Sequence, residues 1–354
     1  MVNAIGLMSG TSADGVDAAL LRTDGESRIE FCGGITLHYS SEMRWRLLEA
    51  SQHDIPITEL LRLERDITLY HAQAIEKLRE KHGDKDHPPK LVGFHGHTIR
   101  HVPNEQITLQ IGNPWLLANR TGLPVVSDFR RNDIANEGQG APLVSMFHSA
   151  IFDSEPRPVA VLNLGGVANV TWLGGEGRII AGDTGPGCGL LDEWVQEMAD
   201  MPHDRDGQLA LRGSVNEAIL RNALSSPFFR KKLPKSADRY DFDHVDVSTL
   251  SVEDGAATLC AVTVRAVVDA VKKLPEWPET LWVTGGGVHH PVIMRMLGDS
   301  FKFVRSVEER GLSPDTLEAE CFAWLAVRHS LGLPLTIPET TGCTTAVCGG
   351  AITG

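Results

Sequence analysis

The stretch that decides the fold lies at residues 4–21 and reads AIGLMSGTSADGVDAALL. Two short apolar runs, Ala4–Met8 and Val16–Leu21, flank a segment of Gly, Thr, Ser and Asp residues. Apolar runs of this length on either side of turn-forming residues predict a β-hairpin. The chain therefore opens with two paired strands joined by a glycine-rich turn.

The same design recurs from residue 158 onward. Val159–Leu164 and Ala168–Leu173 are apolar runs separated by the turn Gly165-Gly166, and Arg178–Ala181 predicts a third strand. The two halves are not alike residue by residue, so the repeat is one of design and not of sequence. A glycine-turned hairpin is expected to open each half of the chain.

The remaining pattern mixes helices and strands and predicts an α/β protein. We expect helices over residues 41–81, 190–198, 253–273 and 317–331, and strands over residues 91–94, 124–127 and 280–283. A length of 354 residues predicts about two domains. We place them at residues 1–137 and 138–337, with a helix over residues 338–354 crossing back to the first domain.

Composition and charge narrow the classes of partner. The net charge of −13 repels phosphate backbones, so a nucleic-acid partner is not expected. The six cysteines are scattered without a Cys-x-x-Cys pair, which is typical of reduced thiols in the cytoplasm. No secretory signal and no apolar run of membrane-spanning length is present, so we expect a cytoplasmic protein that does not enter a membrane.

Three glycine-rich turns directly follow predicted strands, at Gly10–Gly15, Asp183–Gly187 and Gly285–Gly287. Glycine lets backbone N–H groups approach and face an anion, and the Thr11, Ser12 and Thr184 hydroxyls add donors. One such turn has an ordinary alternative, a tight connection between elements, whereas three together favour a shared phosphate site. Since neither a P-loop nor a G-x-G-x-x-G motif after a strand is present, these turns would have to hold any nucleotide.

Acidic residues beside these turns are candidates for catalysis. Asp183 ends a predicted strand and enters a Gly-Pro-Gly turn, a position suited to a general base for phosphoryl transfer. Its alternative role is to cap the helix that begins near Cys188. Asp14 and Asp17 bracket the first turn, where they would contact Mg²⁺ through water or stabilise the turn itself.

Histidines and arginines near two other strands suggest contacts to a substrate. His95, His97 and His101 have no acidic or cysteine partners at zinc-site spacing, so hydrogen bonding to substrate or packing is favoured over a metal. Arg130 or Arg131 would pair a substrate carboxylate in bidentate fashion. The alternative is an ion pair with a neighbouring aspartate, since exposed pairs are common.

Ordered blocks along nearly the whole chain carry a family resemblance. They are Gly6–Ser12, Asp14–Asp17, Gly93–Gly96, Leu109–Gly112, Ser127–Arg131, Gly138–Leu143, Asn163–Asn169, Asp183–Gly187, Gly285–Gly287, Glu318–Ala319 and Phe322–Ala326. With these blocks the chain closely resembles the anhydro-N-acetylmuramic acid kinases, a branch of the actin-like sugar kinase superfamily. The resemblance implies an α/β fold of two actin-like (ribonuclease H-like) domains with a central cleft between them, and commonly a homodimer.

The resemblance also implies the cofactors, ATP and Mg²⁺, and the residues around them. Nucleotide contacts are implied for Gly10, Thr11, Ser12, Ala13, Asp14, Gly15, Val16, Asp17, Gly165, Gly166, Thr184, Gly185, Gly285, Gly286 and Gly287. Sugar contacts are implied for His95, Arg130, Arg131, Gln139 and Glu318, and Mg²⁺ contacts for Asp14, Asp183 and Glu318.

The implied reaction joins hydrolysis to phosphorylation. Asp183 would deprotonate a water that attacks the anomeric carbon of 1,6-anhydro-N-acetylmuramic acid, and the freed O6 would attack the γ-phosphate of ATP. N-acetylmuramic acid 6-phosphate would result, as a step in recycling cell-wall amino sugar.

Three departures from the family pattern bear on the substrate. His97 stands where glutamine is usual, Cys188 where asparagine is usual, and Lys235–Arg239 keeps only the ends of a Lys-Ser-Thr-Gly-Arg block, with Ala237-Asp238 inside it. A levoglucosan-type anhydrosugar kinase is therefore one alternative. An actin-like ATPase or nucleotide sensor without a sugar acceptor is the other.

Overall fold

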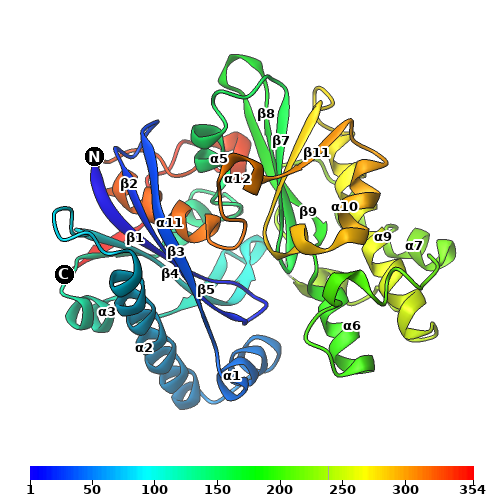
Figure 1. The fold of residues 1–354 in the computed structure, drawn as a ribbon, viewed down its shortest axis with the longest axis horizontal. Coiled ribbons are helices and arrows are strands. Elements are labelled where there is room, and N and C mark those ends of the chain that lie inside the picture. The colour runs from blue at the N-terminus through cyan, green and yellow to red at the C-terminus, as the bar shows by residue number, and fades with distance from the viewer. Residues whose placement is uncertain (238) are drawn as a thin grey trace. The chain divides into compact units, whose positions relative to one another are not determined.

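The computed structural model describes residues 1–237 and 239–354. Asp238, one of the departures from the family pattern, lies outside the described residues. The chain divides into two compact units, which we call unit 1 (Met1–Asp153 with Asp315–Gly354) and unit 2 (Ser154–Pro314). Each unit is built around one β-sheet (Figure 1).

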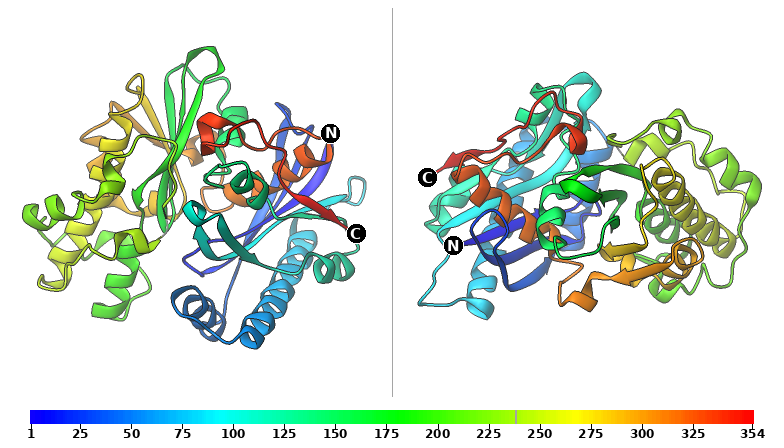
Figure 2. Two further views of the ribbon diagram at one scale, coloured as in Figure 1. Left: turned by 180° about the vertical axis from the view of Figure 1, so that it is seen from behind. Right: turned by 90° about the horizontal axis from the view of Figure 1, so that it is seen from above.

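The sheet of unit 1 starts as an antiparallel meander and continues with parallel strands. Its strands follow the order β3-β2-β1-β4-β6-β12, with β5 paired to β4. They are β1 (Val2–Ser9), β2 (Gly15–Thr23), β3 (Ile29–His38), β4 (Leu91–Val102), β5 (Ile107–Ile111), β6 (Val125–Ser127) and β12 (Ala351–Thr353). Strands β4 and β6 run parallel to β1, whereas β12 closes the edge antiparallel to β6. The C-terminal residues, red in Figure 2, thus return to the N-terminal sheet.

Two long helices pack on the sheet of unit 1. Helix α2 contacts β2 and β3, and α11 contacts β1, β2 and β4. The backbone of α11 approaches so closely that a Cβ on Gly6 would lie 1.7 Å from the Ala319 carbonyl oxygen. The helices of this unit are α1 (Ser41–Gln52), α2 (Ile57–His82), η1 (Pro103–Glu105), α3 (Pro114–Thr121), α4 (Arg131–Ala135), α5 (Ser145–Ile151), α11 (Leu317–Ser330) and α12 (Pro338–Thr341).

Unit 2 repeats the strand order of unit 1. Its sheet runs β9-β8-β7-β10-β11, with β7, β8 and β9 as an antiparallel meander and β10 and β11 parallel to β7. The strands are β7 (Val159–Leu164), β8 (Val167–Leu173), β9 (Ile179–Pro186), β10 (Thr280–Thr284) and β11 (Phe303–Ser306). With the hairpin strand β5 and the edge strand β12 left out of the count, the sheet of unit 1 has the order 3-2-1-4-5, the same as the sheet of unit 2. The predicted repeat of design is therefore present in the topology.

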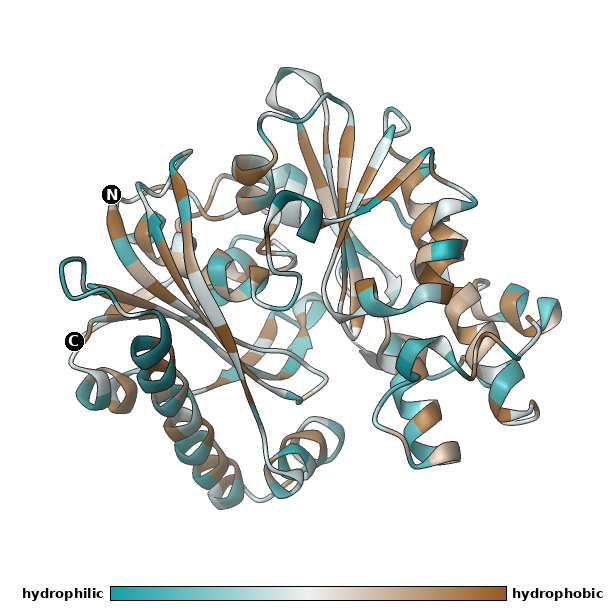
Figure 3. Ribbon diagram, viewed as in Figure 1, coloured by the Kyte–Doolittle hydropathy of each residue, from teal (hydrophilic) through white to brown (hydrophobic). Residues whose placement is uncertain are grey.

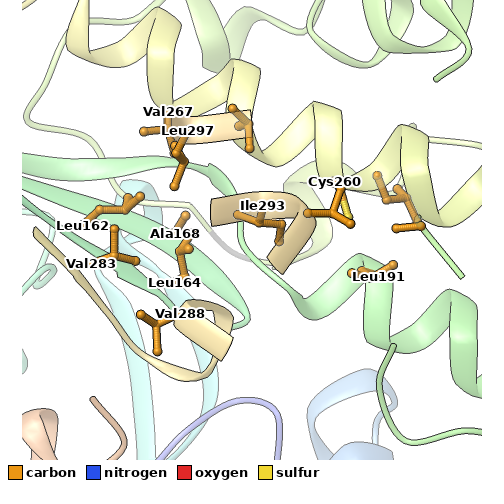
Figure 4. Close-up of a cluster of buried hydrophobic side chains, with 14 of the residues drawn as sticks. Leu162, Leu164, Ala168, Leu191, Cys260, Val267, Val283, Val288, Ile293 and Leu297 are labelled. Carbon is orange, nitrogen blue, oxygen red and sulfur yellow. The ribbon is translucent and has the colours of Figure 1, made fainter. Parts of the chain in front are cut away.

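The core of unit 2 lies between its sheet and the helices that pack on it, α9 and α10 among them. Leu162 and Val283 from the strands meet Val267, Ile293 and Leu297 from α9 and α10 (Figure 4). Hydrophobic residues recur along the strands of both units and on the sides of helices that face them (Figure 3). The helices are η2 (Gly175–Gly177), α6 (Gly189–Ala199), η3 (Arg205–Gly207), α7 (Glu217–Ala223), α8 (Pro227–Arg230), η4 (Arg239–Phe242), α9 (Val252–Val271), η5 (Gly286–His289), α10 (Pro291–Gly298) and η6 (Val307–Arg310).

Several elements differ from their predicted extent. Strand β9 continues to Pro186, so Asp183 lies within a strand and not in a turn. The single helix predicted over residues 338–354 is wrong, because α12 has one turn and the chain then extends to pair β12 with β6. The compact units also differ from the predicted domain boundaries. Residues 138–153 and 315–337 belong to unit 1, since α11 packs on its sheet.

Within the described residues, no helix combines the length and apolar character needed to cross a membrane.

Candidate active site

The first glycine-rich turn joins β1 to β2. The Ala13 N–H donates to the Gly10 carbonyl at 3.0 Å, and Ala13 adopts a left-handed φ of 54°. Ala13 and Val16 are fully buried, so neither residue presents a side chain to a ligand. Thr11 is exposed, and exposed Asp14 lies 3.5 Å from the Arg44 guanidinium. The turn therefore offers hydroxyl and backbone groups of the kind that bind phosphate.

Carboxylates gather beside this turn. Asp17 on β2 accepts a hydrogen bond from the Thr36 hydroxyl of β3 at 2.6 Å. Burial raises the pKa of Asp17 to about 7, with further contributions from Glu318, Asp315 and Asp14, whereas the Thr36 hydrogen bond opposes the rise. Burial also raises the pKa of Glu318, and Arg130 opposes that rise. Like charges held together disfavour ionisation, so this cluster is suited to a cationic ligand.

The described residues contain no group of three or more His, Cys, Asp or Glu side chains arranged to hold a metal ion. A site for Mg²⁺ can still form around one or two carboxylates, because this ion usually keeps several waters and binds phosphate oxygens. Asp14 and Glu318 both contribute to the raised pKa of Asp17 and therefore lie in one neighbourhood of unit 1.

The histidines of β4 belong to hydrogen-bond networks. Arg130 Nε donates to His95 Nε2 at 3.0 Å, and His95 Nδ1 therefore carries the proton that bonds the Gly96 carbonyl. The Tyr39 hydroxyl donates to Ser9 Oγ, and Ser9 Oγ is also hydrogen-bonded to His97 Nδ1 at 2.9 Å. Burial lowers the pKa of His97 to about 3 and holds that of His95 well below its usual range, with Arg130 contributing to the latter. Both rings are thus neutral at physiological pH.

The two predicted arginines differ in their surroundings. Arg130 Nη1 donates to the Gly140 carbonyl at 2.6 Å, which ties it to the loop that carries Gln139. Arg131 is exposed and lies 3.5 Å from Asp128, the ion pair that was the alternative in the sequence analysis. Arg130 therefore shares a network with His95 and the Gln139 loop, and Arg131 points to a surface pair.

Asp183, in unit 2, is a buried carboxylate on β9 opposite Asn169 of β8. Its N–H donates to the Lys235 carbonyl at 2.8 Å, and its Oδ2 accepts from the Ala237 N–H at 2.7 Å. The segment around Lys235 and Ala237 thereby fixes the orientation of the carboxylate. Lys235 in this segment is only 5% exposed.

The Lys235 side chain holds this segment against Phe228. Its Nζ donates to the Phe228 carbonyl at 2.8 Å and lies 3.7 Å from the centroid of the Phe228 ring. Burial lowers the pKa of Lys235 to about 8, Lys273 lowers it further, and Asp183 opposes the change. A cation so placed favours a negative charge on Asp183.

Three glycine segments of unit 2 converge at the ends of β7, β9 and β10. The Gly187 and Cys188 N–H groups donate to the carbonyls of Gly166 and Gly165, at 2.9 and 2.8 Å. A Cβ on Gly285, whose φ is +81°, would lie 2.4 Å from Asn163 Oδ1. The predicted turns at Gly165-Gly166 and Gly285–Gly287 are thus brought together. Thr184 does not join them as a donor, because its buried hydroxyl already donates to the Ala168 carbonyl at 3.1 Å.

Comparison with known protein families matches residues 2–354 to the family described as anhydro-N-acetylmuramic acid kinase. The chain belongs to this family. Proteins named anhydro-N-acetylmuramic acid kinase from Gluconobacter oxydans and Zymomonas mobilis are 45% and 42% identical to it. These alignments cover 97% of both chains for the first and 99% of both for the second. The predicted family, the predicted phosphotransferase class and the family's role in recycling cell-wall amino sugar are confirmed.

A solved structure supports the fold class independently. The activator of the 2-hydroxyisocaproyl-CoA dehydratase from Clostridium difficile, with bound ADPNP, aligns with a TM-score of 0.50 at 14% identity. The alignment covers 94% of this chain and 96% of that chain. The predicted α/β class with two actin-like units is therefore confirmed, and the kinase family accounts for the use of ATP.

Sequence reasoning did not predict the partners of some residues in these networks. Ser9 and Asn169 lie within blocks that carry the family resemblance, but their neighbours are fixed only by the strand register. Asp133 is 1% exposed and carries no motif of its own. Its partners lie about 200 residues away in the chain, at Thr336 and Thr341.

Proposed function

We propose that this enzyme opens 1,6-anhydro-N-acetylmuramic acid with water and phosphorylates O6 from ATP in a single coupled reaction. A water oxygen bonds to the anomeric carbon, the bond from that carbon to O6 breaks, and O6 accepts the γ-phosphoryl group. Asp183 takes the proton of the attacking water. The products are N-acetylmuramic acid 6-phosphate and ADP.

The orientation of Asp183 is the observation that carries this proposal. One carboxylate oxygen is held by the Ala237 N–H, and the strand and the Lys235 carbonyl fix the backbone. A general base must be held within hydrogen-bonding reach of the proton that it removes, and a rigid carboxylate meets that requirement. The buried Lys235 ammonium supports the ionised form that a base needs.

The turns are proposed to bind the nucleotide. In unit 1 the Gly10–Asp17 segment would hold phosphate oxygens, and in unit 2 the Gly165-Gly166 and Gly285–Gly287 segments would approach the nucleotide through their backbones. The carboxylates proposed to contact Mg²⁺, largely through water, are Asp14 and Glu318 within unit 1 and Asp183 within unit 2. When bound, the ion would neutralise charge on the transferred phosphoryl group.

The sugar is proposed to be bound by Arg130, Gln139 and Glu318 of unit 1, with His95 supporting Arg130 and with Arg131 as an outer contact. Arg130 is the group suited to a lactyl carboxylate, because guanidinium pairs carboxylates in bidentate geometry. His95 is neutral and already bonded at both ring nitrogens, so its contribution is to hold Arg130. We further propose a cytoplasmic homodimer without a nucleic-acid partner, as the scattered cysteines, the charge and the family resemblance suggest.

The deciding experiment incubates the protein with ATP, Mg²⁺ and either anhydro-N-acetylmuramic acid or levoglucosan in H₂¹⁸O. ADP release should depend on the muramic substrate, and the product should carry one ¹⁸O at C1 and none in its phosphate. Equal turnover of levoglucosan would favour the broader anhydrosugar kinase. If ADP were released at the same rate with and without either sugar, the result would favour an actin-like ATPase without a sugar acceptor and would overturn the proposal.

A further inference from the structure

A buried carboxylate beside the proposed sugar contacts has no assigned role. Asp133 lies on α4 and is 1% exposed. Its Oδ1 accepts from the Gly140 N–H at 2.6 Å, and its Oδ2 accepts from the hydroxyls of Thr336 and Thr341 at 2.5 and 2.6 Å. Burying a carboxylate is unfavourable unless hydrogen bonds compensate, and here three donors do so.

Asp133 and Thr341 accept the hydrogen bonds of all three backbone N–H groups of the loop at residues 138–140, which carries Gln139. The Gly138 N–H donates to the Asp133 carbonyl at 2.9 Å, and the Gln139 N–H donates to the Thr341 carbonyl at 2.7 Å. The Gly140 N–H donates to the Asp133 side chain. The loop at residues 138–140 is therefore held from two sides, by α4 and by the C-terminal segment that contains Thr341.

The network reaches Arg130 through one further bond. The Gly140 carbonyl accepts from Arg130 Nη1, and Arg130 Nε donates to His95. A shift of Gly140 would thus move the acceptor that orients the guanidinium. Since hydrogen bonds to charged groups are among the stronger ones, the position of Gly140 bears directly on the rotamer of Arg130.

We infer that Asp133, together with Thr336 and Thr341, is a positioning residue that sets the affinity for the sugar. It acts by fixing the Gly138–Gly140 loop and, through Gly140, the guanidinium of Arg130. This inference rests on the proposed function, because Arg130 and Gln139 are proposed sugar contacts. It adds that the C-terminal segment, about 200 residues away in the chain, takes part in substrate recognition.

The test uses a substitution that keeps the shape of the side chain. Thr341→Val removes one donor to Asp133 and retains the Thr341 carbonyl that holds Gln139. We expect the KM for anhydro-N-acetylmuramic acid to rise about threefold to tenfold, less than the full loss of one hydrogen bond to a charged group, because the effect reaches the sugar only through Gly140 and Arg130. The KM for ATP should stay within about twofold of wild type, because the nucleotide turns share no bond with Asp133. Thr341→Ser should restore the sugar KM.

Two further variants separate positioning from general weakening of the fold. Thr68→Val also removes a buried hydroxyl in unit 1, one that accepts from the Asn113 N–H, and it should leave the sugar KM unchanged. Arg130→Met should raise the sugar KM by itself. Adding Thr341→Val to Arg130→Met should then raise it little further, because the guanidinium that the network positions is gone.

Asp133→Asn keeps the shape and an oxygen for Gly140, so it should fold and show an increase similar to that of Thr341→Val. If Arg130→Met raises the sugar KM while Thr341→Val and Asp133→Asn do not, the inference is wrong and the proposed function stands. If the wild-type protein shows no sugar-dependent ADP release, both fail. Full additivity of Thr341→Val and Arg130→Met would also overturn the inference.

Discussion

Unit 1 and unit 2 share one strand order but place their polar groups differently around the hairpin. In unit 1 the turn between β1 and β2 spans residues 10–14, and the carboxylate beside it, Asp17, is on the second strand. In unit 2 the turn is Gly165-Gly166, and the carboxylate, Asp183, is on the third strand opposite Asn169. The longer turn adds hydroxyl and amide groups that can bind a phosphate. The shorter turn adds no such groups, and the strand register places Asp183 opposite Asn169. We therefore expect the same scaffold to bind phosphate in unit 1 and to hold a general base in unit 2.

The surroundings of the two carboxylates differ in the same direction. Asp17 lies near Glu318, Asp315 and Asp14, and its pKa is raised to about 7, chiefly by burial. Asp183 accepts a hydrogen bond from the Ala237 N–H, and the buried Lys235 lies nearby. Both groups stabilise the negative charge of the Asp183 carboxylate. A bound cation would stabilise the negative charge of Asp17, whereas groups of the fold itself stabilise the negative charge of Asp183.

The strongest test of this division exchanges each carboxylate for an amide. We expect Asp183→Asn to reduce kcat by about 10²–10⁴-fold, the usual loss when a general base is removed. The KM for ATP should remain within about twofold, because Asp183 is proposed to act on water and contributes to Mg²⁺ only through solvent. Steady-state kinetics of ADP release with anhydro-N-acetylmuramic acid measures both constants.

Asp17→Asn is the matched variant for that test. It should mainly raise the KM for ATP, since Asp17 lies in the proposed phosphate segment. A full loss of kcat in Asp17→Asn together with near-normal turnover in Asp183→Asn would reverse the roles of the two units.

A smaller effect concerns stability in acid. Five buried histidines lie in unit 1, and burial lowers the pKa of each of them: His71, His95, His97, His101 and His148. Below their unfolded pKa of about 6.5 the unfolded chain binds more protons than the folded one, so stability falls as the pH falls. The raised pKa values of Asp17 and Glu320, both about 7, act in the opposite sense over about pH 4–7.

Because the five histidines outnumber the three carboxylates whose pKa is raised, Asp17, Glu318 and Glu320, we expect unit 1 to lose stability on the order of a few kcal/mol between pH 7 and pH 5. Unit 2 holds the buried Lys235 instead, whose pKa of about 8 lies below its unfolded value. That shift makes stability rise only above pH 8, so it plays no part in this range. Hydrogen exchange resolved by peptide at pH 7 and pH 5 should show protection lost first in unit 1. Earlier loss in unit 2, or equal loss in both, would contradict the assignment.

Much of the fold followed from local sequence. The opening hairpin, the second hairpin, and helices α9 and α11 were predicted because alternating apolar runs and glycine turns are local signals. The convergence of Gly165-Gly166 with Gly285–Gly287 required the strand order, which no local pattern contains. The predicted end of β9 before Asp183 was wrong, because Gly-Pro-Gly was interpreted as a turn although edge strands accept proline.

The candidate site could be predicted only where its residues lie within local sequence motifs. Family resemblance marked Asp183, Arg130 and Gln139, each within a recognisable block. The residues that hold them in place carry no such signal, because Asp133 and Lys235 depend on partners distant in sequence. Thr184 is the converse case, since a hydroxyl beside a glycine turn predicts a ligand contact, whereas in the structure this hydroxyl donates to a carbonyl within the sheet.

The smallest predicted effect compares two threonines, one from each unit. Thr11 is exposed on the turn of unit 1, and Thr184 is fully buried in unit 2. Thr11→Val should raise the KM for ATP by about twofold to tenfold, the range for one lost hydrogen bond, without changing the melting temperature. Thr184→Val should leave that KM unchanged and lower the free energy of unfolding by about 1 kcal/mol, because the Ala168 carbonyl loses its donor. Kinetics and thermal unfolding of both variants test this comparison. A rise in the KM for ATP in Thr184→Val would indicate that the Thr184 hydroxyl contacts the ligand. An unchanged KM for ATP in Thr11→Val would contradict a role for the Thr11 hydroxyl in binding phosphate.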